Sequence, residues 1–461
     1  MFEETACRQD GPVVVIVGGG ASGTLTAVHV LRAFRHGAPR LVMIDKDGRH
    51  GLGQAYSTGD SRHLLNACTA RMSALADEPE HLLDWVRARG LDAADTDYLP
   101  RRLYGEYLRS VLAEARASRP GSRVEEVTGA VVSLTTGERP VVRLADGRAF
   151  PADAVVLATG NRPPAAWPHL RAGDRYVPDA WAPGALDGRG DGSPVLVVGT
   201  GLTMVDLAVT LTGAHPGTVV HAVSRHGLLP ARHRCPQPPP RSIPLPEGPL
   251  TLAVLMRTVR AAIRANGGEW HAIIDGLRPH VPSLWERLPE GDRRRFLTLA
   301  SRYWEIHRHR IPPETAARVD ALRDSGRLRV LRGEPVSATD LGDGVLVGLD
   351  TPEGPRELRV GHVVNGTGPA RDLAADPFLH TLFLSGAARP DSLGLGLDAT
   401  AEGALLDAAG RPHERVFTLG PPLRGLRYET TAIPEIRDQA AALAERLTRV
   451  DGLARIPDLL S

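Results

Sequence analysis

Three glycines near the N-terminus have the types and spacing of residues that bind phosphate. Gly18, Gly20 and Gly23 follow the β-branched run 13–17, and Asp45 ends the next apolar run. The first glycine allows a tight turn, the second admits an anionic group to the backbone, and the third lets a helix pack on the strand. The N–H groups at the start of that helix would bind a pyrophosphate, and the Asp45 carboxylate would accept hydrogen bonds from a ribose. The pattern predicts a dinucleotide site, against the alternative of a structural glycine turn.

A second, less regular copy of this pattern occurs downstream. Gly199 and Gly201 follow the apolar run 195–198, but Met204 replaces the third glycine, so we expect helix and strand to lie slightly further apart. The returning strand 218–223 ends in Ser224-Arg225 instead of an acid. An arginine there suits the 2′-phosphate of NADPH, and the alternative is a solvated surface arginine.

The cysteines narrow the chemistry. Cys7, Cys68 and Cys235 are scattered and form no CxxC, which argues against a disulfide framework and against a dithiol oxidoreductase. Cys68 is expected to be a small buried hydrophobe. Two nucleotide sites without a redox dithiol indicate a flavoprotein, with FAD at the first site and NADPH at the second.

The elements that must position these residues indicate an α/β protein. Each glycine turn lies between a strand and a helix, as in parallel Rossmann-like units. We expect two such dinucleotide-binding domains of three-layer ββα type, the second inserted in the first. The expected spans are 1–190 for the first part of the FAD domain, 191–335 for the NAD(P)H domain with a helical insertion at about 229–315, and 336–461 for the second part of the FAD domain.

Composition excludes several other classes. The chain has 461 residues with 55 Lys+Arg against 54 Asp+Glu, so no net field would draw it to nucleic acid or to an anionic membrane. The acidic start lacks a secretory h-region, and no apolar stretch is long enough to span a bilayer. We expect a soluble cytoplasmic protein without metal, because the histidines lack metal-ligand spacing.

The sequence resembles the two-dinucleotide-binding-domain flavoproteins, and among them the FAD–NAD(P)-binding group allied to flavin-containing and N-hydroxylating monooxygenases. The resemblance covers nearly the whole chain. The segments that carry it are Val14 to Gly23, His63 to Asn66, Met72 to Ala74 with Asp77 and Pro79, Tyr98 to Gly105, Ala158 to Asn161, Val198 to Asp206, and Ala432 to Arg437.

The resemblance implies roles for further residues. It places Asn66 over the flavin, where an amide could donate to a flavin C4a-hydroperoxide or steady the nicotinamide; the alternative is a loop asparagine making backbone bonds. It also directs the helix that begins near Pro434 at the flavin, with Glu435 as a helix cap. The expected catalytic residue is Asn66, and the expected cofactor-binding residues are Gly18, Gly20, Ala21, Ser22, Gly23, Asp45, Lys46, Gly160, Gly199, Gly201, Leu202, Thr203, Ser224, Arg225, Gly420 and Ile433.

The segment 302–310 is open to two interpretations. Its arginines, histidines and aromatic residues suit a surface for substrate or for the NADPH phosphate, but the pattern favours an arginine-rich solvated helix. Apolar residues from Phe296 to His307 predict a helical stripe, and the Pro-rich stretch 229–249 predicts a loop.

The resulting hypothesis is an FAD-dependent, NADPH-using monooxygenase acting through a flavin C4a-hydroperoxide on a small molecule. The resemblance favours an amine, with O₂ as the second substrate. One alternative is a flavin oxidase or an NAD(P)H reductase without oxygen insertion. Another is a non-catalytic nucleotide-binding sensor or scaffold, to which the degenerate Met204 position lends some support. The sequence does not indicate an oligomeric state.

Overall fold

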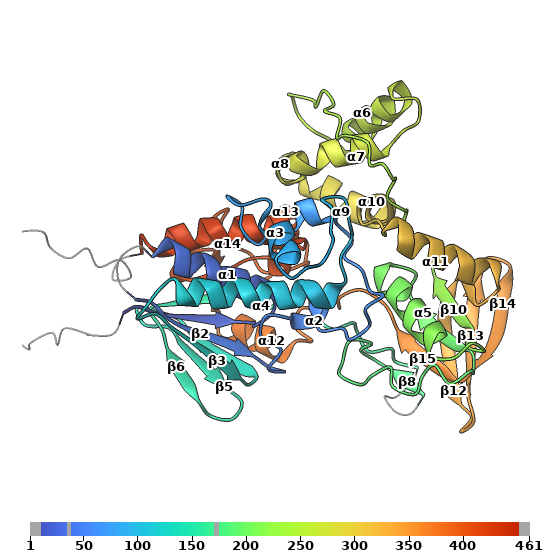
Figure 1. The fold of residues 1–461 in the computed structure, drawn as a ribbon, viewed down its shortest axis with the longest axis horizontal. Coiled ribbons are helices and arrows are strands. Elements are labelled where there is room, and N and C mark those ends of the chain that lie inside the picture. The colour runs from blue at the N-terminus through green and yellow to red at the C-terminus, as the bar shows by residue number, and fades with distance from the viewer. Residues whose placement is uncertain (1–10, 35–37, 170–174, 451–461) are drawn as a thin grey trace, which may run out of the picture. The chain divides into compact units, whose positions relative to one another are not determined.

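The computed structural model describes residues 11–34, 38–169 and 175–450, so Cys7 and the acidic start lie outside the described residues. The chain divides into two compact units. Unit 1 comprises residues 1–57, 68–161 and 372–461, and unit 2 comprises residues 58–67 and 162–371. Each unit is built on its own central sheet (Figure 1). A glycine turn follows the strand Val13–Val17 in unit 1 and the strand Val195–Val198 in unit 2.

Unit 1 contains a six-stranded sheet in the order β16-β17-β7-β1-β2-β3. All neighbours are parallel except β16 and β17. Helices α1, α4 and α14 pack side by side on one face (Figure 1). The bounds are β1 Val13–Val17, α1 Ala21–Ala33, β2 Arg40–Asp45, α4 Arg101–Ala117, β3 Arg123–Thr128, β7 Ala154–Leu157, β16 Ala404–Leu406, β17 Pro412–Thr418 and α14 Ile433–Leu447.

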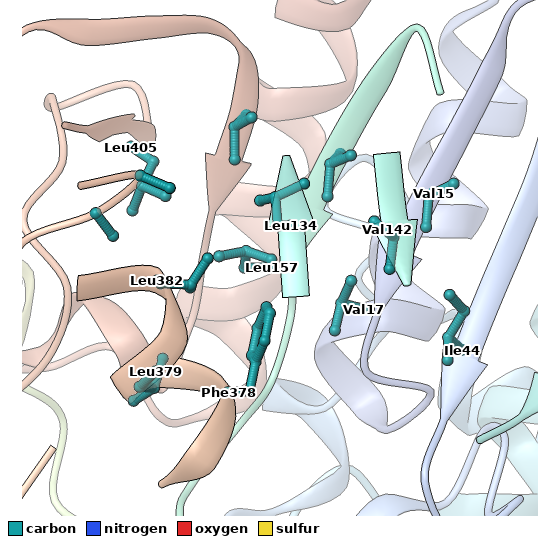
Figure 2. Packing of buried hydrophobic residues seen from close by; sticks show 14 of the residues in the cluster. Val15, Val17, Ile44, Leu134, Val142, Leu157, Phe378, Leu379, Leu382 and Leu405 are labelled. Carbon is teal, nitrogen blue, oxygen red and sulfur yellow. The ribbon is translucent and has the colours of Figure 1, made fainter. Parts of the chain in front are cut away.

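The other face of this sheet is covered by an antiparallel meander and one helix. Side chains of Val15, Val17, Ile44 and Leu157 on the sheet pack with those of the meander and of the helix in one buried cluster (Figure 2). The covering elements are β4 Val131–Thr135, β5 Val141–Leu144, β6 Ala149–Pro151 and α12 Pro377–Leu384. The strands of the sheet are apolar on both faces because both faces are covered. Unit 1 therefore has three layers.

Shorter helices fill the connections of unit 1. They are α2 Gly53–Tyr56, α3 His81–Arg87, α13 Arg424–Arg427 and the 3-10 turns at Thr69–Arg71 and Pro421–Leu423.

Unit 2 repeats the layered arrangement. Its five-stranded sheet has the order β11-β10-β9-β15-β8 and is parallel throughout, with α5 and α11 against one face and an antiparallel meander against the other. The bounds are β8 Tyr176–Val177, β9 Val195–Val198, α5 Leu202–Ala214, β10 Val220–Ser224, α11 Pro313–Asp324, β11 Leu328–Arg332, β12 Glu334–Asp340, β13 Val345–Thr351, β14 Gly354–Val360 and β15 His362–Asn365. The predicted fold class, two ββα dinucleotide-binding units with the second inserted in the first, is confirmed.

A helical insertion interrupts unit 2 between β10 and α11. The first helix of the insertion, α6, spans Leu252–Ala265, and Gly267-Gly268 follows its end. The expected stripe from Phe296 to His307 is two helices, not one, because α9 ends at Leu299 and α10 begins at Ser301. The helices are α6 Leu252–Ala265, α7 His271–Leu277, α8 Val281–Arg287, α9 Glu290–Leu299 and α10 Ser301–Arg308, with a 3-10 turn at Arg278–His280. The Pro-rich stretch 229–249 contains no helix or longer strand.

The unit bounds differ from the spans expected from the sequence. Residues 162–190 belong to unit 2 because β8 pairs with β15, and residues 336–371 belong there because their meander packs on the same sheet. The ten residues 58–67, here named the strap, also belong to unit 2 although both flanking segments belong to unit 1. As functional divisions the spans 1–190, 191–335 and 336–461 remain predictions.

Candidate functional site

The first glycine turn leaves no room for side chains. Gly18 has φ +113°, and a Cβ on Gly23 would lie 1.9 Å from the carbonyl oxygen of Gly18. A positive φ of this size disfavours any residue with a Cβ. The N–H of Gly18 donates a hydrogen bond to the backbone carbonyl of Ile44 at 2.8 Å, which fixes the turn beside the end of β2. Ala21, Ser22 and the closely packed Gly23 thus form the first turn of α1 directly after β1.

Asp45 is held at this turn by backbone donors. Its carboxylate accepts from the N–H of Gly19 at 3.2 Å and from the N–H groups of Asp47 and Arg49 at 3.0 Å each. Lys46 is exposed and pairs with Asp47 at 3.0 Å. The structure therefore brings Asp45 to the glycine turn, while the Lys46 side chain is engaged with its neighbour.

A buried histidine that the sequence did not single out lies against the same turn. The His50 side chain is 8% exposed, and a Cβ on Gly19 would lie 2.6 Å from its Nδ1. Neither ring nitrogen has a hydrogen-bond partner among the described residues. Buried polar atoms in proteins nearly always have partners. A phosphate or ribose at the turn would supply one, so the residues present fit a dinucleotide.

Gly420 and the start of α14 adjoin the turn from the C-terminal part of unit 1. A Cβ on Gly420 would approach Ser22 Oγ to 2.9 Å. The Gly420 N–H donates to Gln439 Oε1 at 2.9 Å, and its carbonyl accepts from Thr430 Oγ1 at 2.9 Å. Ile433 is buried as the first residue of α14. Gly160 follows β7, whose end lies beside β1 in the parallel register.

The second turn reproduces the first despite Met204. Gly199 has the same φ of +113° as Gly18, and Gly201 precedes α5 with φ −83° and ψ −162°, against −74° and −163° at Gly20. Leu202 and Thr203 begin α5, and Met204 is fully buried in the core of unit 2. The core thus accommodates the methionine while the backbone keeps the conformation of the first turn.

A basic cluster surrounds the end of β10 in unit 2. Ser224 is paired in register with Arg332 on β11, and its Oγ contacts Thr200 Oγ1 at 2.8 Å. His226 is exposed, and partial loss of solvent around its ring together with the charges of Arg302, Arg225 and Arg332 lowers its pKa. Arg225 itself lies 3.5 Å from Glu334. The charges of three arginines therefore act on His226, which lies next to the position where the sequence predicts a 2′-phosphate.

Sequence reasoning missed Arg302 and Arg332 as members of this cluster. The Nε of Arg302 is buried and has no hydrogen-bond partner among the described residues. Arg332 ends β11, the strand next to β10, so the parallel order of the strands was the signal that could have found it. Arg302 lies in the distant helical insertion, and no local pattern links it to β10.

Asn66 lies at the end of the strap, which is anchored on unit 2. His63 Nε2 contacts Thr210 Oγ1 at 2.8 Å, and Thr210 donates to Asp60 at 2.8 Å. The backbone carbonyl of Asn66 accepts from His233 Nε2 at 3.0 Å. These contacts fix the segment that carries the asparagine to α5 and to the Pro-rich loop.

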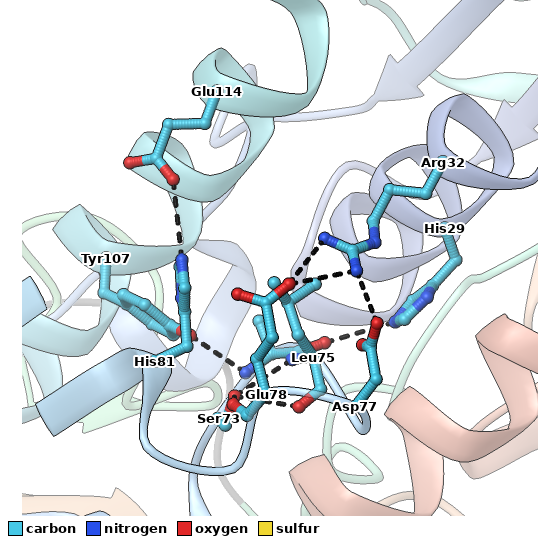
Figure 3. A network of polar contacts seen from close by, with 10 residues as sticks. His29, Arg32, Ser73, Leu75, Asp77, Glu78, His81, Tyr107 and Glu114 are labelled. Carbon is cyan, nitrogen blue, oxygen red and sulfur yellow. Dashed lines mark hydrogen bonds and ion pairs between the residues drawn. The ribbon is translucent and has the colours of Figure 1, made fainter. Parts of the chain in front are cut away.

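The neighbouring segment 72–79 belongs to unit 1 and is tied to α1 and α4. His29 Nε2 contacts the carbonyl of Ala74 at 3.1 Å, and Arg32 pairs with Asp77 at 2.7 Å (Figure 3). Tyr107 accepts from the Ala74 N–H at 3.0 Å and contacts His81 at 2.9 Å (Figure 3). These contacts account for this motif as a structural connection.

The favoured interpretation of residues 302–310 as a solvated helix is wrong for its end. Arg308 and Arg310 are buried, at 9% and 2% exposure, because α10 packs on α7 and the chain then turns inward at Ile311.

Within the described ranges no group of His, Cys, Asp and Glu is arranged to hold a metal ion, and no helix has the length and apolarity to cross a membrane. Cys68 is half-buried, and burial raises the pKa of its thiol.

The fold consists of two α/β units, each with a glycine turn between a strand and a helix, as in dinucleotide-binding domains. Residues 15–162 match the family model described as FAD-NAD(P)-binding, so this part of the chain is an FAD-NAD(P)-binding domain. The chain is 28% identical over 272 residues to an L-aspartate N-monooxygenase (nitrosuccinate-forming) of Streptomyces davaonensis; the match covers 47% of this chain and 41% of that protein. The matched stretch thus spans less than half the length of this curated relative.

Two solved structures share the fold over nearly their whole length. An ornithine N-hydroxylase of Kutzneria sp. 744 superposes with a TM-score of 0.62 at 14% identity, covering 95% of this chain and 99% of that one. An L-lysine 6-monooxygenase of Pseudomonas syringae gives a TM-score of 0.63 at 16% identity, covering 95% and 100%. At these identities the likeness shows the fold.

Proposed function

We propose that the chain is an FAD-dependent, NADPH-using monooxygenase that hydroxylates the nitrogen of a small amine. The observation that carries this proposal is the pair of glycine turns with matching backbone geometry, one in each unit. The curated relative is an N-monooxygenase by name, and the two solved neighbours are an N-hydroxylase and a monooxygenase of amino acids, which supports the reaction class.

FAD would be held by unit 1. Gly18 to Gly23 and the first N–H groups of α1 would bind the pyrophosphate, because these donors have no partners within the helix. Asp45 would accept from the ribose, and the unpartnered ring of His50 would donate to the same part of the cofactor. The start of α14 would direct its N–H groups and its dipole at the electron-rich edge of the flavin.

NADPH would be held by unit 2. Gly199 to Thr203 would bind its pyrophosphate in the same way. Arg225, Arg302 and Arg332 would pair with the 2′-phosphate, and Ser224 would donate to it. Because NADH lacks this phosphate, the basic cluster favours NADPH.

The two cofactors together supply hydride transfer and the activation of O₂. The protein's own residues have three tasks: to bind the nucleotides, to exclude water and to position the amine. The side-chain amide of Asn66 would donate a hydrogen bond toward the reacting oxygen, and the strap would hold that amide in a fixed orientation. Removing such a positioned donor typically slows catalysis by about 100-fold or more.

The alternative of a non-catalytic sensor rested on Met204. Burial of this side chain without a change in the turn removes that support. An oxidase or a reductase would use the same two nucleotide turns and differs only in the fate of the reduced flavin. The discriminating quantity is the ratio of oxygenated product to NADPH consumed.

The first experiment is to purify the protein, record its absorption spectrum and add NADPH without oxygen. Bound FAD and bleaching of the flavin band by NADPH support the proposal. A protein that takes up no FAD, or whose flavin NADPH does not reduce, contradicts it.

A further inference from the structure

The largest fully buried side chain in the described residues is Arg310, which follows α10 at the end of the helical insertion. It is 2% exposed, and its Nη2 donates to Asp275 Oδ1. Its Nε and Nη1 have no hydrogen-bond partner within the described ranges. A guanidinium presents five N–H donors in a planar fork, and an anion is the partner that this fork selects.

Asp275 does not account for this fork. Its other oxygen, Oδ2, accepts from Gln237 Nε2 at 3.1 Å, so both carboxylate oxygens are engaged. Gln237 comes from the Pro-rich loop and Asp275 from α7. In a buried ion pair with a purely structural role, the remaining donors also find partners. Here both carboxylate oxygens of Asp275 have hydrogen-bond partners, whereas Nε and Nη1 of Arg310 have none among the described residues.

Aromatic rings lie beside the guanidinium. The Trp270 ring centroid is 5.9 Å from Arg310 Cζ. Trp270 stacks on His271 at 3.7 Å and meets the edge of His307 at 4.5 Å. A cationic fork beside an aromatic wall is suited to a small ligand with a carboxylate and an aliphatic body.

A short backbone ladder connects this group to Asn66. Ile311, next to Arg310, donates its N–H to Ala231 at 2.9 Å and accepts from His233 at 2.9 Å. The ring of His233 in turn donates to the carbonyl of Asn66. Arg310 and the strap asparagine are therefore linked through one pair of backbone hydrogen bonds within unit 2.

We propose that Arg310, with Trp270 at its side, binds the carboxylate of an amino-acid substrate. The proposal rests on the proposed function for the nature of the ligand, a small amine, and adds that this amine carries a carboxylate. The carboxylate accepts hydrogen bonds from the unused N–H groups of Arg310. Because the Arg310 side chain is 2% exposed, the ligand reaches it only when the residues that cover it shift.

The experiment measures equilibrium binding to the oxidised, FAD-loaded protein by calorimetry. The probes are L-ornithine, L-lysine and L-aspartate, each compared with the amine that remains when its α-carboxylate is removed. Wild type is expected to bind at least one amino acid about tenfold or more tightly than its decarboxylated partner. Arg310→Gln is expected to abolish that preference while leaving the affinity for the decarboxylated amine unchanged. Arg318→Gln, on the surface of α11, is the matched control and should keep the preference.

Binding of NADP⁺ to each variant checks that unit 2 is folded. If Arg310→Gln does not bind NADP⁺, the Arg310→Lys variant is measured instead. Lysine keeps a positive charge beside Asp275 but lacks the planar fork of donors, so the preference for the amino acid over its decarboxylated partner should fall several-fold. The proposal is overturned if a folded Arg310 variant keeps the full preference for the amino acid over the decarboxylated amine. It is also overturned if the wild type binds none of the three amino acids more tightly than the corresponding decarboxylated amine. Binding needs no turnover, so failure to hydroxylate any amine would contradict the proposed function and not this result.

Discussion

His233 donates from Nε2 to the backbone carbonyl of Asn66 over 3.0 Å. This bond joins the Pro-rich loop to the end of the strap, so Asn66 is held through its backbone carbonyl.

Asn66→Ala should separate flavin reduction from oxygenation. The rate of flavin reduction by NADPH should stay within about twofold, whereas product formed per NADPH should fall about tenfold or more, because the amide donor is lost. Stopped-flow absorbance and product quantification measure the two quantities.

His233→Leu acts on the same amide through its position and should lower the product yield by a smaller factor than Asn66→Ala. Its KM for NADPH should not change. An Asn66→Ala variant with an unchanged product yield would remove the role assigned to this residue.

Arg302→Ala and Arg332→Ala should each raise the KM for NADPH by about tenfold, because each removes a charged partner of the 2′-phosphate. The KM for NADH should not change. Arg329→Ala, an exposed arginine three residues earlier on the same strand, is the control and should leave both values unaltered. Equal effects on NADPH and NADH would show that these arginines do not contact the 2′-phosphate.

His50→Leu should weaken FAD binding by about tenfold, because the imidazole is the buried donor without a protein partner at the first turn. Fluorescence titration of the apoprotein with FAD gives the dissociation constant. His380→Leu, at an exposed position in α12, is the matched control. An unchanged FAD affinity in His50→Leu would assign this ring a structural role only.

Gly23→Ala and Gly201→Ala should have opposite effects on folding. A Cβ on Gly23 collides with the backbone of Gly18, so this variant should lose FAD and fold poorly. A Cβ on Gly201 meets no atom within 4 Å, so this variant should fold and bind FAD. Its KM for NADPH should nevertheless rise, because the new methyl group occupies the space of the pyrophosphate. Normal NADPH kinetics in folded Gly201→Ala would contradict the second site.

Asp60→Asn should destabilise the strap in a pH-dependent way. Burial raises the pKa of the Asp60 carboxyl, but hydrogen bonds from Arg62 and Thr210 outweigh it and hold that pKa well below its usual value. A lowered folded-state pKa contributes stability above the unfolded pKa of about 3.9 and loses it as the pH falls further. The variant should therefore be about 1–3 kcal/mol less stable near neutral pH. The difference should shrink below about pH 4, as measured by chemical denaturation. A difference that does not depend on pH would contradict the assignment.

The first glycine turn and the acid beside it could be predicted from sequence because they are local. Gly18 to Gly23 and Asp45 lie within two strands and one helix, and the spacing alone places them together. The second turn was predictable for the same reason, although the sequence could not show that the core would accept Met204. Its expected effect on the spacing of helix and strand stays a prediction.

The remaining parts depend on contacts between distant segments. The strap joins unit 2 through Thr210 and His233, which lie more than 140 residues away in the chain. The charge of Arg302 in the insertion acts on His226, just after the end of β10. Arg310 pairs with Asp275 of α7, which also accepts a hydrogen bond from Gln237 of the Pro-rich loop. A charged residue in an arginine-rich segment looks solvated until its packing partners are known.

The central claim is that NADPH and O₂ are used to hydroxylate an amine nitrogen. The most direct test follows NADPH oxidation in air by the FAD-loaded protein with each candidate amine, and quantifies hydroxylamine product and hydrogen peroxide together. We expect at least one amine to yield hydroxylated product in near-equal amount to the NADPH consumed, with little peroxide. Conversion of all the NADPH to peroxide with every amine, or no oxidation of NADPH at all, would contradict the claim.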